Sequence, residues 1–172
     1  MNINMATNQR SLTITQTDIS VETAGDLDFS FKRIYFNPWG KHQAYQDDVD
    51  RPFKNNIGCG WRHNYNVHVR LSTENGMAYY MDANNNYRKF ERSQEDVNGY
   101  DIYMPMHEGN YHVLTEALSV VMRRNISTGT VEIAFPHGNT SYFSAPINAS
   151  ERYCRLESFK DVSGNTFTLD YD

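Results

Sequence analysis

The sequence predicts an all-β chain, in which successive antiparallel hairpins form an extended, twisted sheet. Three observations support this fold class. Apolar and polar residues alternate with the period of two that is typical of strands. Turns rich in Gly and Asn separate the alternating segments. Outside Val113–Arg124, no apolar period of 3.6 residues persists beyond two turns.

The N-terminal half contains three predicted strand regions. Ser11–Val21 is rich in β-branched residues and is typical of one or two strands. Leu27–Tyr35 and His63–Leu71 both alternate cleanly between apolar and polar residues. We expect residues 1–10 to form an N-terminal arm, and the polar residues 37–56 to form a long surface loop.

The C-terminal half contains further predicted hairpins. Their turns are expected at 82–86, at Glu108-Gly109-Asn110 and at 136–139. The charged segment Glu91–Asn98 is interpreted as a loop. Val113–Arg124 fits both a helical face and a strand, and we favour a strand because the flanking turns match the rest of the chain.

The last predicted hairpin turns on Gly164-Asn165. Phe167, Leu169 and Tyr171 then alternate on one face of its second strand. We expect a single β domain over residues 11–172 with an open strand edge at its C-terminus, because bare edges favour further pairing.

Composition excludes several functional classes. The net charge is −5 and the pI is about 5.6, and no basic cluster is longer than Arg123-Arg124, so we expect no nucleic-acid partner. No apolar run reaches membrane-spanning length. The first five residues have neither a basic leader nor an apolar stretch, which predicts a chain without a secretory signal, located in the cytoplasm.

Cys59 lies between two glycines, and His137 and Asn139 are imaginable partners of a thiol nucleophile. An alternating strand follows Cys59 where a thiolate site would want a helix N-terminus or an adjacent His, so a small buried thiol is the favoured interpretation. Cys154 is the second cysteine, and two thiols are favoured over a disulfide because the chain is expected in a reducing compartment.

Histidines suggest one candidate metal site. If Gly109-Asn110 is a two-residue turn, His107 lies opposite His112, but no third ligand is identifiable nearby. His63 and His68, taken to lie on one strand, would point to opposite faces. The acidic cluster with Asp48, Asp50 and Asn55 lacks the closing Glu of a calcium loop. We therefore predict no catalytic residue, no metal and no cofactor.

The order of the motifs along the chain resembles the segment that precedes the Tyr-Asp (YD) repeats in bacterial Rhs (rearrangement hotspot) proteins. The residues that carry this resemblance are Leu27-x-Phe29-x-Phe31-x-Arg33-x-Tyr35, Gly58-x-Gly60-Trp61-x-His63-x-Tyr65, Tyr80-x-Asp82 with Phe90, Phe135-x-x-Gly138 with Phe143, and Arg155-Leu-x-Ser158-x-x-Asp161-x-x-Gly164-Asn165 followed by Leu169-x-Tyr171-Asp172. The closing unit resembles a first Tyr-Asp repeat. Asn85-Asn86 and Cys59 depart from the pattern.

The resemblance implies a structural, non-enzymatic role. Rhs proteins wind their repeats into a β-shell that encloses a C-terminal toxin used in interbacterial competition, and type VI secretion exports many of them as effectors without a Sec signal. The expected partners are the remainder of such a shell, or another copy of the chain, through open strand edges. Two alternatives stay open: a stand-alone carbohydrate- or protein-binding β-module that uses Trp39, and a metal- or thiol-dependent enzyme.

Overall fold

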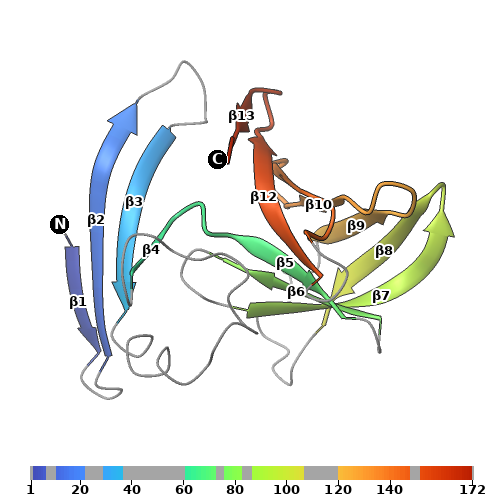
Figure 1. The fold of residues 1–172 in the computed structure, drawn as a ribbon, viewed down its shortest axis with the longest axis horizontal. Helices are drawn as coiled ribbons and strands as arrows, with labels where there is room; N and C mark the ends of the chain where they lie inside the picture. Colours follow the sequence, from blue (N-terminus) through green and yellow to red (C-terminus); the bar gives the residue numbers. More distant parts are fainter. Residues whose placement is uncertain are drawn as a thin grey trace. The chain divides into compact units, whose positions relative to one another are not determined.

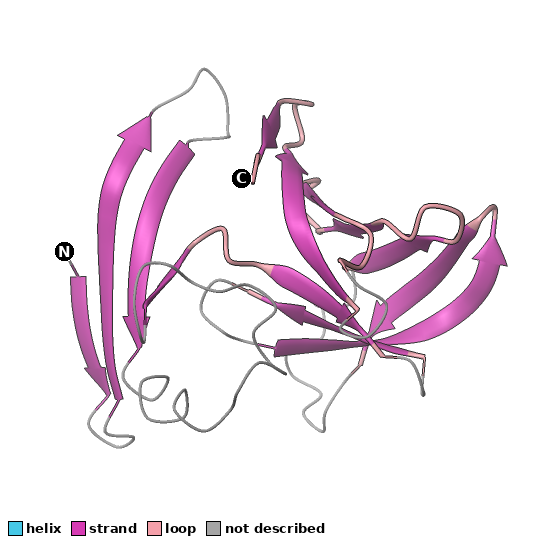
Figure 2. Cartoon of the chain, in the orientation of Figure 1, coloured by secondary structure: helices cyan, strands magenta, loops and turns pink. Residues whose placement is uncertain are grey.

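The computed structural model describes residues 2–6, 11–21, 29–36, 61–72, 76–82, 87–106, 120–147 and 152–171. Within these residues the chain is all-β, as predicted, and only strands and connecting loops are seen (Figure 2). They include no helix that is long and apolar enough to cross a membrane. Contacts group the chain into two compact units, Met1–Thr23 with Asp28–Asn66, and Ala24–Leu27 with Val67–Asp172. Residues 11–172 were expected from the sequence to form one domain.

The first unit contains a four-stranded antiparallel sheet in sequence order. Its strands are β1 (Asn2–Ala6), β2 (Ser11–Val21), β3 (Phe29–Phe36) and β4 (Trp61–His63) (Figure 1). Strand β1 lies within the ten residues that were expected to form an arm. Strand β2 is one continuous strand whose register with β3 shifts between Thr17 and Ile19.

Aromatic rings from β3 pair with rings on β4 and on the turn that follows it. Centroid distances of 5.3 to 5.8 Å join Tyr35 to Trp61, Phe31 to His63, and Phe29 to Tyr65. Arg33 stands 5.5 Å over the Trp61 ring and forms a 2.6 Å ion pair with Asp18 on β2. These contacts use the face of β3 that the alternation of Leu27–Tyr35 predicted.

The second unit contains nine strands. They are β5 (His68–Leu71), β6 (Met77–Met81), β7 (Tyr87–Val97), β8 (Tyr100–Pro105), β9 (Val121–Asn125), β10 (Val131–Ala134), β11 (Thr140–Phe143), β12 (Tyr153–Lys160) and β13 (Thr166–Thr168). Strands β5 to β11 pair with their neighbours in sequence order, and β12 pairs with β5, β11 and β13. Strands β5 to β12 therefore form a closed antiparallel barrel (Figure 1).

The expectation of an extended, open sheet is wrong for this unit. Strand β12 pairs with β11 over Leu156–Lys160 and with β5 over Tyr153–Arg155, so it joins the first and last strands of the meander. Closure removes the two edges that an open sheet of the same strands would expose. Local alternation cannot reveal this pairing, because it has the same period in a closed and in an open sheet.

Inward-pointing side chains fill the barrel. Eight strands make an interior that side chains can fill without leaving a channel. The buried cluster consists of Val67, Val69, Leu71, Ala78, Phe90, Tyr103, Val120, Met122, Val131, Ile133, Phe143, Cys154 and Leu156. Tyr80, Phe135, Phe159 and Leu169 pack against it. The core is therefore continuous from the first strand of the barrel to the segment after β13.

Two predicted elements differ from the structure. The segment His63–Leu71 is not one strand, because a turn at Asn64 and Tyr65 separates β4 from β5. The segment Glu91–Asn98, expected as a loop, continues strand β7 as far as Val97. Its charged side chains are exposed, and the register with β8 shifts twice, so the hairpin bulges while remaining paired.

Part of the ambiguous segment Val113–Arg124 is described. Residues 121–124 belong to strand β9, as favoured, and residues 113–119 lie outside the described residues. The loop at 37–56, the turn at Glu108–Asn110 and residues 83–86 also lie outside them.

Tyr80 on β6 packs its ring edge-on against Phe135 and Phe143, at centroid distances of 6.1 and 6.3 Å. Burial is the main cause that raises the pKa of the Tyr80 phenol to about 12, and the nearby Asp82 raises it further. Since the ordinary value is about 10, the folded protein binds this proton more tightly than the unfolded chain does.

We predict that the barrel loses stability between about pH 10 and about pH 12. The contribution of Tyr80 is fully present below pH 10 and is lost as the pH rises to about 12; it amounts to about 3 kcal/mol. Urea denaturation across this pH range, with phenolate absorbance followed in parallel, measures the loss. Tyr80→Phe keeps the ring and removes the titrating proton, so its stability should fall less steeply. An unchanged slope in this variant would contradict the assignment.

Candidate assembly edge

The hairpin of β12 and β13 is held at its turn by Asp161, which is 3% exposed. The Asp161 carboxylate accepts hydrogen bonds from the Asn165 backbone N–H, at 2.7 Å, and from the Asn165 side-chain amide, at 2.8 Å. Gly164 has a φ of +88°, a conformation that glycine adopts without strain. The turn therefore spans residues 161–165 and includes the Gly164-Asn165 pair on which the sequence placed it.

The segment after β13 is anchored by Tyr171. Its hydroxyl donates to the Leu156 carbonyl at 2.5 Å, and the Arg155 guanidinium lies 4.4 Å from the centre of its ring. Burial is the main cause that raises the pKa of the Tyr171 phenol above its ordinary value. Phe167, Leu169 and Tyr171 are partly buried, as the alternation predicted, while the residues between them are exposed.

One edge of β13 pairs with β12, and among the described residues no strand pairs with the other edge. The Leu169 N–H donates to the Glu157 carbonyl at 2.7 Å, which extends the pairing beyond β13. Hydrogen-bonded pairs alternate along an antiparallel ladder, so Phe167 is bonded to β12 as well. Thr166 and Thr168 therefore direct their backbone N–H and C=O groups away from β12.

The hairpin of β10 and β11 has a turn with the same hydrogen bonds. The Phe135 N–H donates to the Asn139 carbonyl, and the Gly138 N–H donates back to the Phe135 carbonyl. The β12–β13 turn repeats both bonds with Asp161, Gly164 and Asn165. Pairing of β11 with β12 brings the two turns together, so that a Cβ atom on Gly138 would lie 3.0 Å from Val162.

The described structure does not bring together most of the candidate site residues that the sequence suggested. Cys59, Trp39, the pair His107 and His112, and the acidic residues Asp48, Asp50 and Asn55 lie outside the described residues. His137 is exposed on the β10–β11 turn. His63 and His68 lie on different strands, in different units, rather than on one strand as assumed. The described residues contain no group of three or more potential metal ligands.

Cys154 is a free thiol that faces the barrel core and has no exposed surface. Burial is the main cause that raises the pKa of this thiol to about 12. The thiol is therefore protonated at neutral pH and is not a nucleophile, since thiolate is the reactive form.

A buried carboxylate that pairs with two partly exposed arginines was not predicted from the sequence. Asp101 on β8 is 6% exposed and lies 3.8 Å from Arg92 on β7 and 3.6 Å from Arg124 on β9. Two guanidinium groups thus compensate one buried carboxylate across three neighbouring strands. The sequence does place charged residues at alternating strand positions. Which face of these strands is buried, however, is decided only by the closure of the barrel.

No protein-family model matches the chain, and no curated protein matches it.

We predict that Gly138→Ala destabilises the barrel more than Gly99→Ala. The two glycines have nearly equal φ angles, +85° and +84°. The backbone strain that an alanine adds, about 1–2 kcal/mol, is therefore the same in both variants. Only at Gly138 does the added methyl group meet the Val162 side chain; nothing lies within 4 Å at Gly99. Free energies of unfolding from urea denaturation measure the excess, which we expect to be about 1 kcal/mol or more.

Removing the contact provides the control for this prediction. Val162→Ala in the Gly138→Ala background should recover the excess loss and leave the backbone strain. Equal losses for the two glycine variants would show that the turns do not contact one another in solution.

We also predict that Asp161→Ala loosens the β12–β13 hairpin by about 1–2 kcal/mol, because two hydrogen bonds of a buried carboxylate are lost. Hydrogen exchange of the Phe167 and Leu169 amides should accelerate accordingly. Asp170→Ala is the matched control, since Asp170 is exposed and accepts only a local bond from Tyr171. Similar acceleration in both variants would argue against the role given to Asp161.

Proposed function

We propose that the chain is a structural, non-enzymatic section of an Rhs-type YD-repeat protein. In this role it contributes strands to a β-shell that encloses a C-terminal toxin used in interbacterial competition. The protein is made in the cytoplasm and exported without a Sec signal, through type VI secretion or a similar route. The proposal rests on the ordered motifs of the sequence and on the hairpins of the second unit.

The observation that carries the proposal is the repetition of one hairpin along the sheet. The β10–β11 and β12–β13 turns share their hydrogen bonds and a glycine with φ near +85°, and they lie against each other through Gly138 and Val162. A shell built of repeats needs such a unit, because each repeat must bury its apolar face against its neighbour. The second unit is a closed barrel and not an extended sheet, so the shape of its sheet does not support the proposal.

The β12–β13 hairpin has contacts that would suit a Tyr-Asp repeat. Asp161 organises the turn, while Tyr171 returns to the first strand of the hairpin through Leu156 and Arg155. The outer edge of β13 offers the backbone groups of Thr166 and Thr168 to a further strand. A sheet that continues by one more hairpin would pair there and would stack its turn next to Val162.

Native mass and architecture test the proposal. An antibody raised against the second unit should recover, from the cells that make the protein, a product far larger than the 20.0 kDa of this chain. Cryo-electron microscopy of that product should show a hollow β-shell around a protease-protected C-terminal region. The matched control is the 172-residue chain made separately, which should have the barrel and no enclosed volume. A native product of 20.0 kDa, or a larger one without a shell, would overturn the proposal.

A further inference from the structure

Among the described residues no strand pairs with the outer edge of β13, and the edge itself carries neither Lys nor Pro. Natural edge strands commonly carry Lys, Pro or a covering loop that blocks another strand. The residues that face outward along this edge are Thr166, Thr168 and Asp170, all of them exposed. Threonine is a good strand former, and all three residues have a backbone N–H group that can donate to another strand.

The same edge is complementary to itself. If two copies pair antiparallel about a two-fold axis at Thr168, that residue lies opposite its own counterpart. Thr166 of one copy then lies opposite Asp170 of the other, which puts a hydroxyl donor beside a carboxylate acceptor. An isologous contact of this kind repeats each pair twice and closes after two copies.

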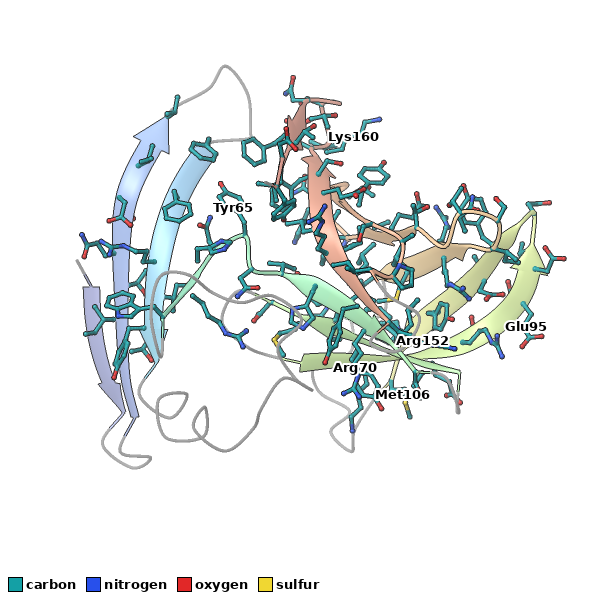
Figure 3. The ribbon with its side chains drawn as sticks, in the orientation of Figure 1. Tyr65, Arg70, Glu95, Met106, Arg152 and Lys160 are labelled. Carbon is teal, nitrogen blue, oxygen red and sulfur yellow. The ribbon has the colours of Figure 1, made fainter. Side chains whose placement is uncertain are left out.

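The two faces of this paired edge also match. Phe167 and Leu169 are partly buried on the inner face, and the two-fold axis puts Phe167 of one copy opposite Leu169 of the other. On the outer face, Lys160 of β12, which is labelled in Figure 3, lies opposite Thr166 in the strand register. Asp170 of the second copy therefore approaches on the same face as Lys160, with opposite charge.

From this complementarity we infer that strand β13 is a self-association site, at which two copies of the chain join their barrels into one antiparallel sheet with Thr168 at the two-fold axis. The occupant is a second copy because register, apolar pairs and charges all agree when β13 is placed against itself. This goes beyond the proposed shell, in which the following strand of the same protein would take the edge.

Introducing a positive or a negative charge at Thr168 tests the inference. Sedimentation velocity over a wide range of concentrations should show that the 172-residue chain dimerises. Thr168→Lys and Thr168→Glu each put two like charges opposite one another, so each variant should dimerise at least about ten-fold more weakly. An equimolar mixture of the two variants should recover dimers, and native mass spectrometry should identify them as mixed Lys–Glu pairs.

Ser163→Lys is the matched control, because it adds the same charge to the exposed turn of the same hairpin, away from the edge. It should dimerise like the unmodified chain, and circular dichroism should show that all variants fold. A chain that stays monomeric at all concentrations would overturn the inference. So would dimers that persist in both Thr168 variants, or variants whose mixture does not recover them. These outcomes leave the shell proposal unaffected, since it concerns the product made in the native cells.

Discussion

The pairing of strand β12 on both of its edges is the constraint on which the second unit depends. Leu156–Lys160 pair with β11, while Tyr153–Arg155 pair with β5, the first strand of the meander. This closes eight strands into a ring and gives every strand a defined inner face. The burial of Cys154, Tyr80 and Asp101 follows from closure, because each lies at a strand position whose direction is set by the ring. The raised pKa values of Cys154 and Tyr80 are consequences of that burial.

Strand β12 also connects the closed barrel to the open edge. It extends past the end of β5, and its distal half, Ser158–Lys160, pairs with β13 on the edge that β5 has left. A register shift in its pairing with β11 lies close to this change of partner. Strand β12 thus closes the barrel and also pairs with β13, whose other edge, among the described residues, is open to a further strand. For this reason both the shell proposal and the self-association site centre on the β12–β13 hairpin.

Much of the local structure could be predicted from residue patterns. The Gly164-Asn165 turn, the faces of β3 and β13, and the absence of helix in the described ranges all follow from alternation and turn chemistry. The charged strand β7 was missed because exposed charges weaken the apolar alternation, and the split of His63–Leu71 was missed because Tyr65 continues that alternation through a turn.

The sequence by itself determined most of the strands, the direction in which their side chains alternate and most of the turns, because these are properties of neighbouring residues. Only the tertiary structure decided that the sheet closes, that the buried Asp101 meets Arg92 and Arg124, and that the turns of Gly138 and Val162 touch. The physical reason is that these contacts join residues distant along the chain through strand register. Register depends on which strands meet, and a period of two is identical in every sheet that the strands could form.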